Sequence, residues 1–489
     1  MTGPVGLRAA DLCLLLPFRP ATCQVLGPLE AFRDGLREAG LVTSGDAPDV
    51  VVAPVGLADA AVALRPRALL LLGRAPARPL RAAGYRVRRL LATPDPERPR
   101  LLVPLEPGPV RVALRHVSPR RPRRLAARDT LVLGALSAGR APARMTVTVA
   151  SRDEPRPWLV DAAVASGGDP SGPWFLQTGT GDDLQRVVLH LPSPGRGRVV
   201  KTSRTPGGTA AFDRDERAAA LVRDLPPQVL ARVPRLLRRD RDGVLPVAVE
   251  ERAPGRQLLD LVGSRWPADR RLAEVEPVAA WLLDLAEATR TPAGGAAGEL
   301  ARLRDEVLPA WRELEPGLAL PPGLLDAVAD VPGVLAHNDL GCWNIVADGE
   351  GRFGVVDWES ARRPGLPLWD LVYFLSDALA TLEHPEGGDG PRRAGHVLSV
   401  LRGEDRHSPV LFDHVSRYAA RLGLPPAAVG PLVTLSWLHH GLSPAARAAA
   451  LGDDGAPPGA QALLAGPWLA DPALGPTWRA WRRFAGEPA

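Results

Sequence analysis

Lysine is almost absent from this sequence. Lysine and arginine together account for 60 of the 489 residues, yet Lys201 is the single lysine. A lysine ammonium is a compact point charge on a slim stem, whereas arginine presents a wide planar fork. Lys201 is therefore a candidate for a specific chemical role, although one lysine on a surface strand would also be ordinary.

Cysteines and aromatic residues are scarce as well. Cys13, Cys23 and Cys342 are too few and too scattered for a disulfide framework or a zinc site, so we expect a reducing, cytoplasmic setting. The 12 Trp, 3 Tyr and 8 Phe do not alternate with basic residues, which argues against a base-stacking surface. No nucleic-acid partner is predicted, although the net charge of +5 permits anionic ligands.

Long apolar runs are also missing. The segment 12–18 ends at Arg19 and has no charged leader, so we expect a strand at 12–16 and no signal peptide. No run reaches about 18 apolar residues, so no membrane span is expected. A hydrophobic content of 45% and a charged content of 24% fit a globular protein of roughly two to four domains.

Residues 1–165 are predicted to form a small α/β domain of unknown role, with an amphipathic helix at 27–39. Gly73 follows an apolar run in a weak resemblance to a nucleotide-binding turn. The basic run 119–124 contains two prolines and is interpreted as a solvated linker rather than an anion site. The alternation of strands and helices alone also allows this domain to be an enzyme that binds a nucleotide-sugar or a methyl donor. The strands are expected at 12–16, 50–55, 68–72, 100–105, 130–133 and 145–149.

A Gly/Pro-rich stretch, 166–173, marks a boundary to a second region, 166–255. Closely spaced apolar runs there predict an antiparallel meander followed by a helix and a further strand. The meander strands are expected at 174–178, 184–191 and 198–203, the helix at 213–225 and the last strand at 244–250.

The third region, 256–489, is predicted to be mainly helical. Pro309 is expected to kink or split one of its helices. Two short strands, at 344–346 and 353–356, interrupt the helical pattern. The main helices are expected at 276–288, 299–314 and 368–379.

The strongest functional pattern lies in that interruption. His337, Asp339 and Asn344 have the spacing H-x-D-x4-N, and Asp357 closes the next apolar strand. Transfer of a phosphoryl group to a hydroxyl requires a carboxylate beside the attacking oxygen and hard oxygen ligands for Mg²⁺. We therefore predict Asp339 as the base or hydroxyl-orienting group, and His337 as a brace of the loop. Asn344 and Asp357 are the predicted metal ligands.

These motifs resemble those of the aminoglycoside phosphotransferase and choline kinase family. The resemblance covers roughly residues 172–445 and includes Asp-Trp-Glu at 357–359 and Gly-x-Pro-x-x-Asp-Leu at 365–371. It implies an α+β, bilobal protein-kinase-like fold, with a small antiparallel sheet lobe and a mainly helical lobe, preceded here by the α/β domain. It also implies that Asp370 braces the catalytic loop from a helix start.

The resemblance further implies ATP and Mg²⁺ as cofactors, with Lys201 as the phosphate-binding lysine. Glu216, on the next predicted helix, is its expected partner; Asp213 and Asp215 are alternatives.

Gly179, Thr180 and Gly181 lie in the first meander turn. Their backbone N–H groups are predicted to contact phosphates, although the same tripeptide is equally explained as a tight turn. Residues 250–253 would form the interlobe hinge.

The predicted function is transfer of the ATP γ-phosphate to a hydroxyl of a small molecule: an amino sugar, a sugar, a choline-like compound or an antibiotic alcohol. A catalytically weak, pseudokinase-like regulatory module is the alternative. A basic nucleic-acid binder is disfavoured because acidic residues are interspersed with the arginines. Most aromatics available to an acceptor are expected to be core residues; the available side chains are Trp358, Glu359, Trp369, Tyr373, Asp377, Trp437 and His440.

Overall fold

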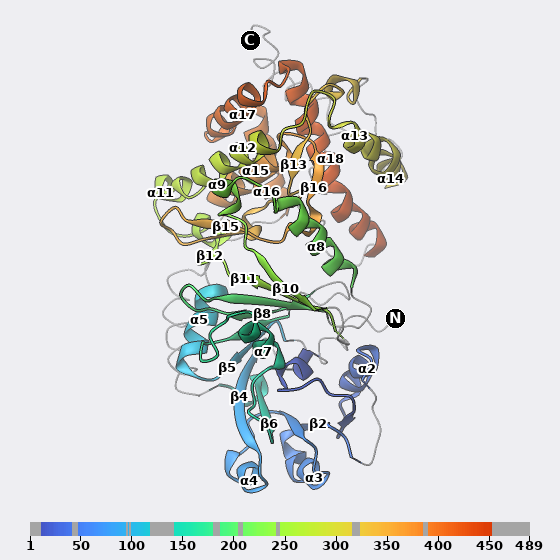
Figure 1. Ribbon diagram of the computed structural model, residues 1–489, viewed down its shortest axis with the longest axis vertical. Helices are drawn as coiled ribbons and strands as arrows, with labels where there is room; N and C mark the ends of the chain where they lie inside the picture. Colours follow the sequence, from blue (N-terminus) through green and yellow to red (C-terminus); the bar gives the residue numbers. More distant parts are fainter. Residues whose placement is uncertain are drawn as a thin grey trace. The chain divides into compact units, whose positions relative to one another are not determined.

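The chain divides into two compact units (Figure 1). Unit 1 comprises residues 1–216 and 234–252, and unit 2 comprises residues 217–233 and 253–489. One division falls inside helix α8 (Ala210–Val222). The computed structural model describes residues 11–41, 47–93, 96, 99–117, 141–178, 186–203, 209–240, 245–314, 323–384 and 390–451.

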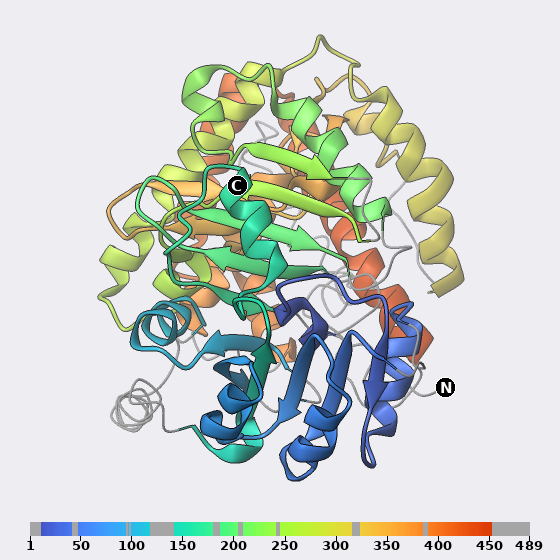
Figure 2. The same cartoon turned by 60° about the horizontal axis from the view of Figure 1, so that its bottom comes forward.

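Among the described residues, an eleven-stranded sheet organises unit 1 (Figure 2). The strand order is β1-β2-β3-β6-β4-β5-β7-β8-β9-β11-β10. The strands are β1 Cys23–Val25, β2 Val50–Pro54, β3 Ala68–Leu72, β4 Arg86–Thr93, β5 Leu101–Pro104, β6 Thr146–Ser151, β7 Phe175–Gln177, β8 Val187–Leu191, β9 Arg198–Thr202, β10 Leu236–Asp240 and β11 Val247–Glu251.

The first part of this sheet is an α/β layer, as predicted. Strands β1, β2 and β3 are parallel, and β6 joins β3 antiparallel. Because successive side chains of a strand face opposite sides, Val50 and Val52 enter the core that holds α2 and α7, while Val51 and Ala53 enter the core that holds α3 and α4. Burial on both faces explains the nearly continuous apolar runs. The helices are α2 Glu30–Glu38, α3 Ala58–Ala63, α4 Ala77–Ala82, α5 Pro107–Val117 and α7 Trp158–Ala165.

The sheet continues past the boundary predicted near residue 165. Strand β5 pairs with β7 through Leu101–Gln177 and Leu102–Leu176, and one buried cluster holds Val149 of β6 together with Val200 of β9. The division of the chain at residues 165 and 255 stays a prediction. The observed hydrogen bonding, however, joins the α/β layer and the meander into a single sheet.

The second part of the sheet is the antiparallel meander. Strands β7, β8, β9, β11 and β10 pair antiparallel in that order. Four of them overlap the strands predicted at 174–178, 184–191, 198–203 and 244–250. Lys201 lies on β9, the third strand of the meander, as predicted.

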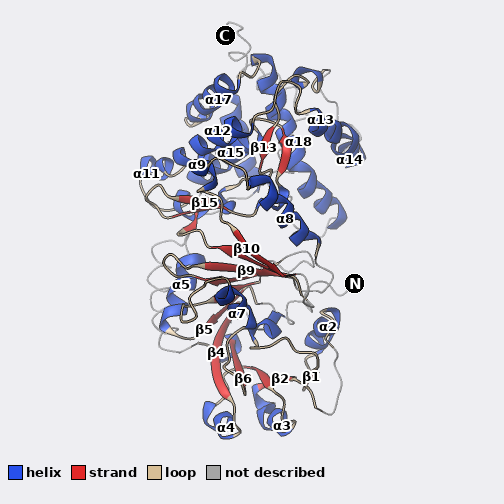
Figure 3. Cartoon of the chain, viewed as in Figure 1, coloured by secondary structure: helices blue, strands red, loops and turns tan. Residues whose placement is uncertain are grey.

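Unit 2 is mainly helical, with two small antiparallel sheets (Figure 3). One sheet joins β12 (Arg256–Gln257), β14 (Ile345–Ala347) and β15 (Phe353–Val355), and the other joins β13 (Val334–Ala336) to β16 (Arg362–Gly365). The helices include α8 from residue 217 onward, then α9 Pro227–Leu230, α10 Leu258–Val262, α11 Ala268–Ala273, α12 Glu276–Thr289, α13 Ala297–Arg302, α14 Leu308–Leu314, α15 Trp369–Glu383, α16 Gly390–Arg402, α17 Ser408–Leu422 and α18 Pro426–Leu451.

The expected interruption at Pro309 takes the form of a wide turn. Helices α13 and α14 are separated by a π-helical segment, Leu303–Val307. Proline has no backbone N–H and its ring crowds the preceding turn, so a widened turn just before Pro309 accommodates it.

The strand predicted at 12–16 is wrong. Asp11–Leu15 forms a 3-10 helix whose five residues are all buried. A short run in which every residue is apolar has no solvent-exposed face, so its hydrophobic periodicity cannot distinguish a strand from a buried helical turn. The strand predicted at 130–133 and the basic run 119–124 lie outside the described residues.

No helix within the described ranges combines the length and the apolar character needed to cross a membrane.

Gly255 tests how closely the backbone of unit 2 is packed. Its φ is +111°, and a Cβ there would lie 2.1 Å from the carbonyl oxygen of Ala347. We expect Gly255→Ala to lower the free energy of unfolding by about 2–4 kcal/mol, measured by urea denaturation. Gly298 of α13 has open space around it and ordinary φ, so Gly298→Ala should be neutral or stabilise by up to about 1 kcal/mol. Equal stability of the two variants would contradict this account.

Candidate functional site

The loop after β13 is held by a buried carboxylate. The backbone N–H groups of His337 and Asn338 donate to Oδ2 and Oδ1 of Asp370, at 2.6 and 2.8 Å. Asp370 is 7% exposed and lies in the first turn of α15. Asn338 has a left-handed φ of +62°, a conformation that asparagine tolerates better than most residues. Asp370 thus has the bracing role that the sequence resemblance implied.

Asp339 and Asn344 lie side by side. Nδ2 of Asn344 donates to the carbonyl oxygen of Asp339 at 2.7 Å and to its Oδ2 at 3.0 Å. A 3-10 turn, Cys342–Asn344, closes the five-residue spacing between them, and Asn344 is buried. Because Nδ2 is engaged with Asp339, the amide oxygen of Asn344 remains as the acceptor of that side chain.

Asp357 adds a second carboxylate to this neighbourhood. It follows β15 with a left-handed φ of +65°, and the N–H of Val356 donates to the carbonyl of Asn344 at 2.9 Å. Burial, followed by the negative charge of Asp357, raises the pKa of Asp339 to about 7, while the bond from Asn344 opposes this shift. The two carboxylates repel each other when both are ionised, and a bound cation would reduce this repulsion.

Asn344 and Asp357 are suited to Mg²⁺. The described residues contain no group of three or more His, Cys, Asp or Glu side chains that could hold a metal ion. Mg²⁺ does not require such a cage, because it commonly takes one or two protein oxygens and completes its shell with water and phosphate oxygens. An amide oxygen and a carboxylate from adjoining segments therefore fit this ion.

His337 is placed as a structural residue. Its ring is buried, and Nε2 lies 3.0 Å from the carbonyl oxygen of Val356, which can only accept a hydrogen bond. Burial lowers the pKa of His337, so the neutral ring with a proton on Nε2 is favoured. This hydrogen bond ties the loop after β13 to the segment that carries Asp357.

Lys201 of unit 1 is nearly buried on β9. Its Nζ lies 2.9 Å from Oε1 of Glu250, and the two side chains are 10% and 15% exposed. Antiparallel pairing places Lys201 opposite Ala248 of β11, so Glu250, two residues further along, shares its face of the sheet.

This pair differs from the predicted one. Glu216, the expected partner of Lys201, lies 3.9 Å from Nε of Arg239, which also binds Asp213 at 2.9 Å. Asp215, another alternative, pairs with Arg186. The contact described for Lys201 is thus with a residue of β11, and its pairing with an acidic residue of α8 stays a prediction. Gly179, Thr180 and Gly181 lie outside the described residues.

Two acidic residues, one in each unit, contact predicted site residues or their loop, and the sequence predicted other roles for both. Glu250 was expected in a hinge; its signal was the period-two spacing that places it on the face of β11 shared with Lys201. Asp377 was available to an acceptor, but its Oδ2 accepts from the N–H of Cys342 at 2.9 Å and its carboxylate also binds Arg393. Its position seven residues after Asp370, two helical turns on, was the corresponding signal.

The aromatic residues named for the acceptor belong to the core of unit 2, as expected for most of them. Trp358, Trp369, Tyr373 and Trp437 are 7% exposed or less. Tyr373 stacks on His440 with ring centroids 3.8 Å apart. These residues support the helices around the loop and do not form an open aromatic cage.

Part of the chain is similar to known phosphotransferases. The model of the phosphotransferase enzyme family, APH, matches residues 180–410. The match spans slightly less than half of the chain, and it indicates a protein-kinase-like fold for that region. The solved structures that match include a candidate aminoglycoside phosphotransferase from Ralstonia eutropha, with 15% sequence identity, a TM-score of 0.43, and coverage of 66% of this chain and 98% of that one. No curated protein matches.

Asp370 offers a test of the loop brace. Asp370→Ala removes both acceptors and leaves two buried N–H groups without partners, so we expect the free energy of unfolding to fall by about 2–5 kcal/mol. Asp284→Asn, on the exposed surface of α12, should change it by less than about 0.5 kcal/mol. Urea denaturation of the two variants would measure the difference, and an Asp370→Ala variant as stable as the parent would refute the brace.

Proposed function

We propose that this protein is a Mg-ATP-dependent phosphotransferase that moves the γ-phosphate to a hydroxyl group of a small molecule. The similarity of residues 180–410 to the phosphotransferase family model supports this class of reaction. The observation that carries the proposal is the placement of Asp339 beside Asn344, in a loop braced by Asp370, with Asp357 close enough to shift the pKa of Asp339.

Each residue has a separate role in this reaction. Asp339 orients the acceptor hydroxyl and accepts its proton as the oxygen attacks the γ-phosphorus and the bond to the β-phosphate oxygen breaks, releasing ADP. The amide oxygen of Asn344 and the carboxylate of Asp357 would hold Mg²⁺, which neutralises charge on the phosphates. Lys201, an ammonium on a rigid strand, would bind nucleotide phosphates. His337 keeps the loop in position.

The acceptor is proposed to be an alcohol without a required cationic group. The carboxylate of Asp377 already accepts hydrogen bonds from the N–H of Cys342 and from Arg393, and the aromatic residues are buried in the core. A cationic acceptor would need free carboxylates or an open aromatic cage. Sugars and other small alcohols therefore fit as well as amino sugars or choline-like compounds.

A screen of ATP consumption with alcohols, sugars, amino sugars and antibiotics tests this function. With the preferred acceptor, Asp339→Asn should lower kcat by about 10²–10⁴-fold, because the proton acceptor is lost while its shape is kept. Asp284→Asn is the matched control and should retain full activity. Tight Mg-ATP binding without turnover on any acceptor would instead favour the regulatory, pseudokinase-like alternative.

The partner of Lys201 gives a separate test. If Glu250 holds the ammonium in place, Glu250→Gln should raise KM for ATP about tenfold, or ~1.4 kcal/mol, with a smaller effect on kcat. Glu216→Gln should stay within about twofold, since the contact described for Glu216 is with Arg239. Steady-state kinetics at saturating acceptor would measure both variants. A larger KM effect from Glu216→Gln would show that the helix residue, and not the strand residue, positions Lys201.

A further inference from the structure

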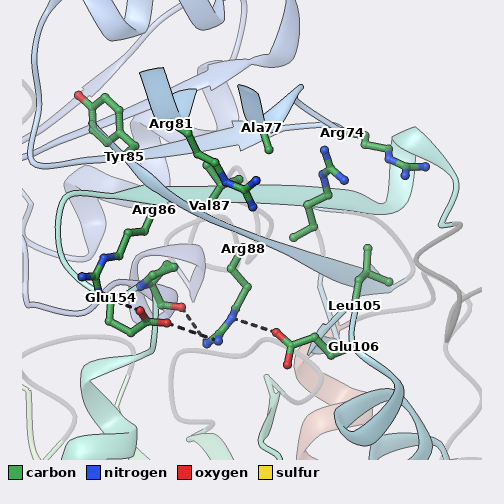
Figure 4. A pocket seen from close by; sticks show the side chains of 12 residues that line it. Arg74, Ala77, Arg81, Tyr85, Arg86, Val87, Arg88, Leu105, Glu106 and Glu154 are labelled. Atoms are coloured by element: carbon green, nitrogen blue, oxygen red, sulfur yellow. Dashed lines mark hydrogen bonds and ion pairs between the residues drawn. The ribbon is translucent and has the colours of Figure 1, made fainter. Parts of the chain in front are cut away.

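The α/β layer of unit 1 contains a pocket lined by arginines (Figure 4). Its volume is about 640 Å³, within the range of small-molecule sites. Arg74 follows β3, Arg81 lies on α4, and Arg86, Arg88 and Arg89 lie on β4. No functional site was expected in this region from the sequence.

The pairing of β4 explains why so many arginines reach one depression. Residues 86–89 pair with β6 on one side, whereas pairing with β5 begins only at Leu90. On the other edge, the N–H of Leu105 donates to the carbonyl of Arg89 at 2.9 Å, and no described strand pairs with residues 86–88. Side chains from both faces of this part of β4 line the pocket.

Two of the five arginines are neutralised by the two glutamates of the pocket. Arg88 lies 3.2 Å from Glu106 and 3.6 Å from Glu154, and Arg86 lies 3.0 Å from Glu154. Figure 4 shows the guanidinium of Arg88 between the two carboxylates. These pairs leave a net charge of three positive units among the lining side chains.

The other three arginines have no acidic partner in the described part of the chain. Arg89 donates to the carbonyl of Ala75 at 2.9 Å, yet its buried Nε has no hydrogen-bond partner. Burial, and then the charges of Arg74 and Arg81, lower the pKa of Arg89. The three guanidinium groups repel one another across the pocket, and a multiply charged anion bound between them would offset this repulsion.

The loop that carries Arg74 is fixed to the sheet. The N–H of Gly73 donates to Thr146 at 2.8 Å, and Oγ1 of Thr148 bridges the carbonyl of Gly73 and the N–H of Ala75, at 2.8 and 3.0 Å. Gly73 itself has a φ of +123°, which favours glycine. The backbone around the arginines is therefore preorganised before any ligand binds.

We propose that this pocket binds a small molecule carrying a phosphate or diphosphate group, through Arg74, Arg81 and Arg89. Guanidinium forks match phosphate oxygens in pairs, and the volume exceeds that of the phosphate alone. A second pocket of about 470 Å³ shares Arg88, Glu106 and Glu154 with the first and is also lined by Trp174, so it offers a wall for the organic part of such a ligand.

Calorimetric titration of the full chain with inorganic pyrophosphate, in low salt and without divalent cations, tests the pocket. The double variant Arg74→Gln/Arg81→Gln changes two exposed side chains and should therefore fold as the parent does. It should weaken pyrophosphate binding at least tenfold, and Arg89→Gln should do the same. Arg78→Gln, on the same helix but outside the pocket, is the matched control and should bind as the parent does. Lys201→Met should also keep this binding, which separates the pocket from the proposed ATP site.

Three results would overturn the proposal. Unchanged binding in the pocket variants, or an equal loss in Arg78→Gln, would show that pyrophosphate responds to the general positive field. Tighter binding of single-stranded oligonucleotides, competing with pyrophosphate and lost in the same variants, would assign the arginines to a nucleic acid. A nucleoside diphosphate that binds more tightly than pyrophosphate would support a role for the adjoining pocket.

Discussion

The carboxylate of Asp370 is the constraint on which the site of unit 2 depends. It accepts hydrogen bonds from two consecutive backbone N–H groups at the start of the loop. These bonds fix the path of the backbone that leads from β13 to the next residue, Asp339. Asp377, two turns further along α15, fixes the other end of the loop through Cys342. A single helix thus holds both ends of the segment, and the side chains of Asp339 and Asn344 meet because the backbone between them has little freedom.

The sheet of unit 1 gives the α/β layer and the meander a common scaffold. Pairing between β5 and β7 means that the strand carrying Lys201 is hydrogen-bonded, through its neighbours, to the strand carrying Arg88 and Arg89. Strands in one sheet share backbone hydrogen bonds and a common core, so the two parts are mechanically continuous. This continuity gives the arginine pocket and the Lys201 strand a physical connection, and it explains why a division near residue 165 is not visible in the hydrogen bonding.

Electrostatics in the two units follows opposite patterns. Around Asp339, negative groups are collected and partly buried, which suits a cation and phosphates bound through it. Around Arg89, positive groups are collected and only partly neutralised, which suits an anion directly. Lys201 is intermediate, because Glu250 balances its charge on the neighbouring strand. A cation near Asp339 and an anion near Arg89 would each reduce the repulsion between like charges in its cluster.

The sequence by itself determined what depends on local order along the chain. Apolar runs located most strands, and the spacing of His337, Asp339, Asn344 and Asp357 predicted the loop and the chemistry proposed for it. Tertiary structure alone decided which residues meet: Glu250 beside Lys201, Asp377 beside Cys342, and Arg74, Arg81 and Arg89 around one pocket. The reason is physical: spacing along one strand or helix indicates the face on which a side chain lies, but it does not identify the neighbouring element that packs against that face.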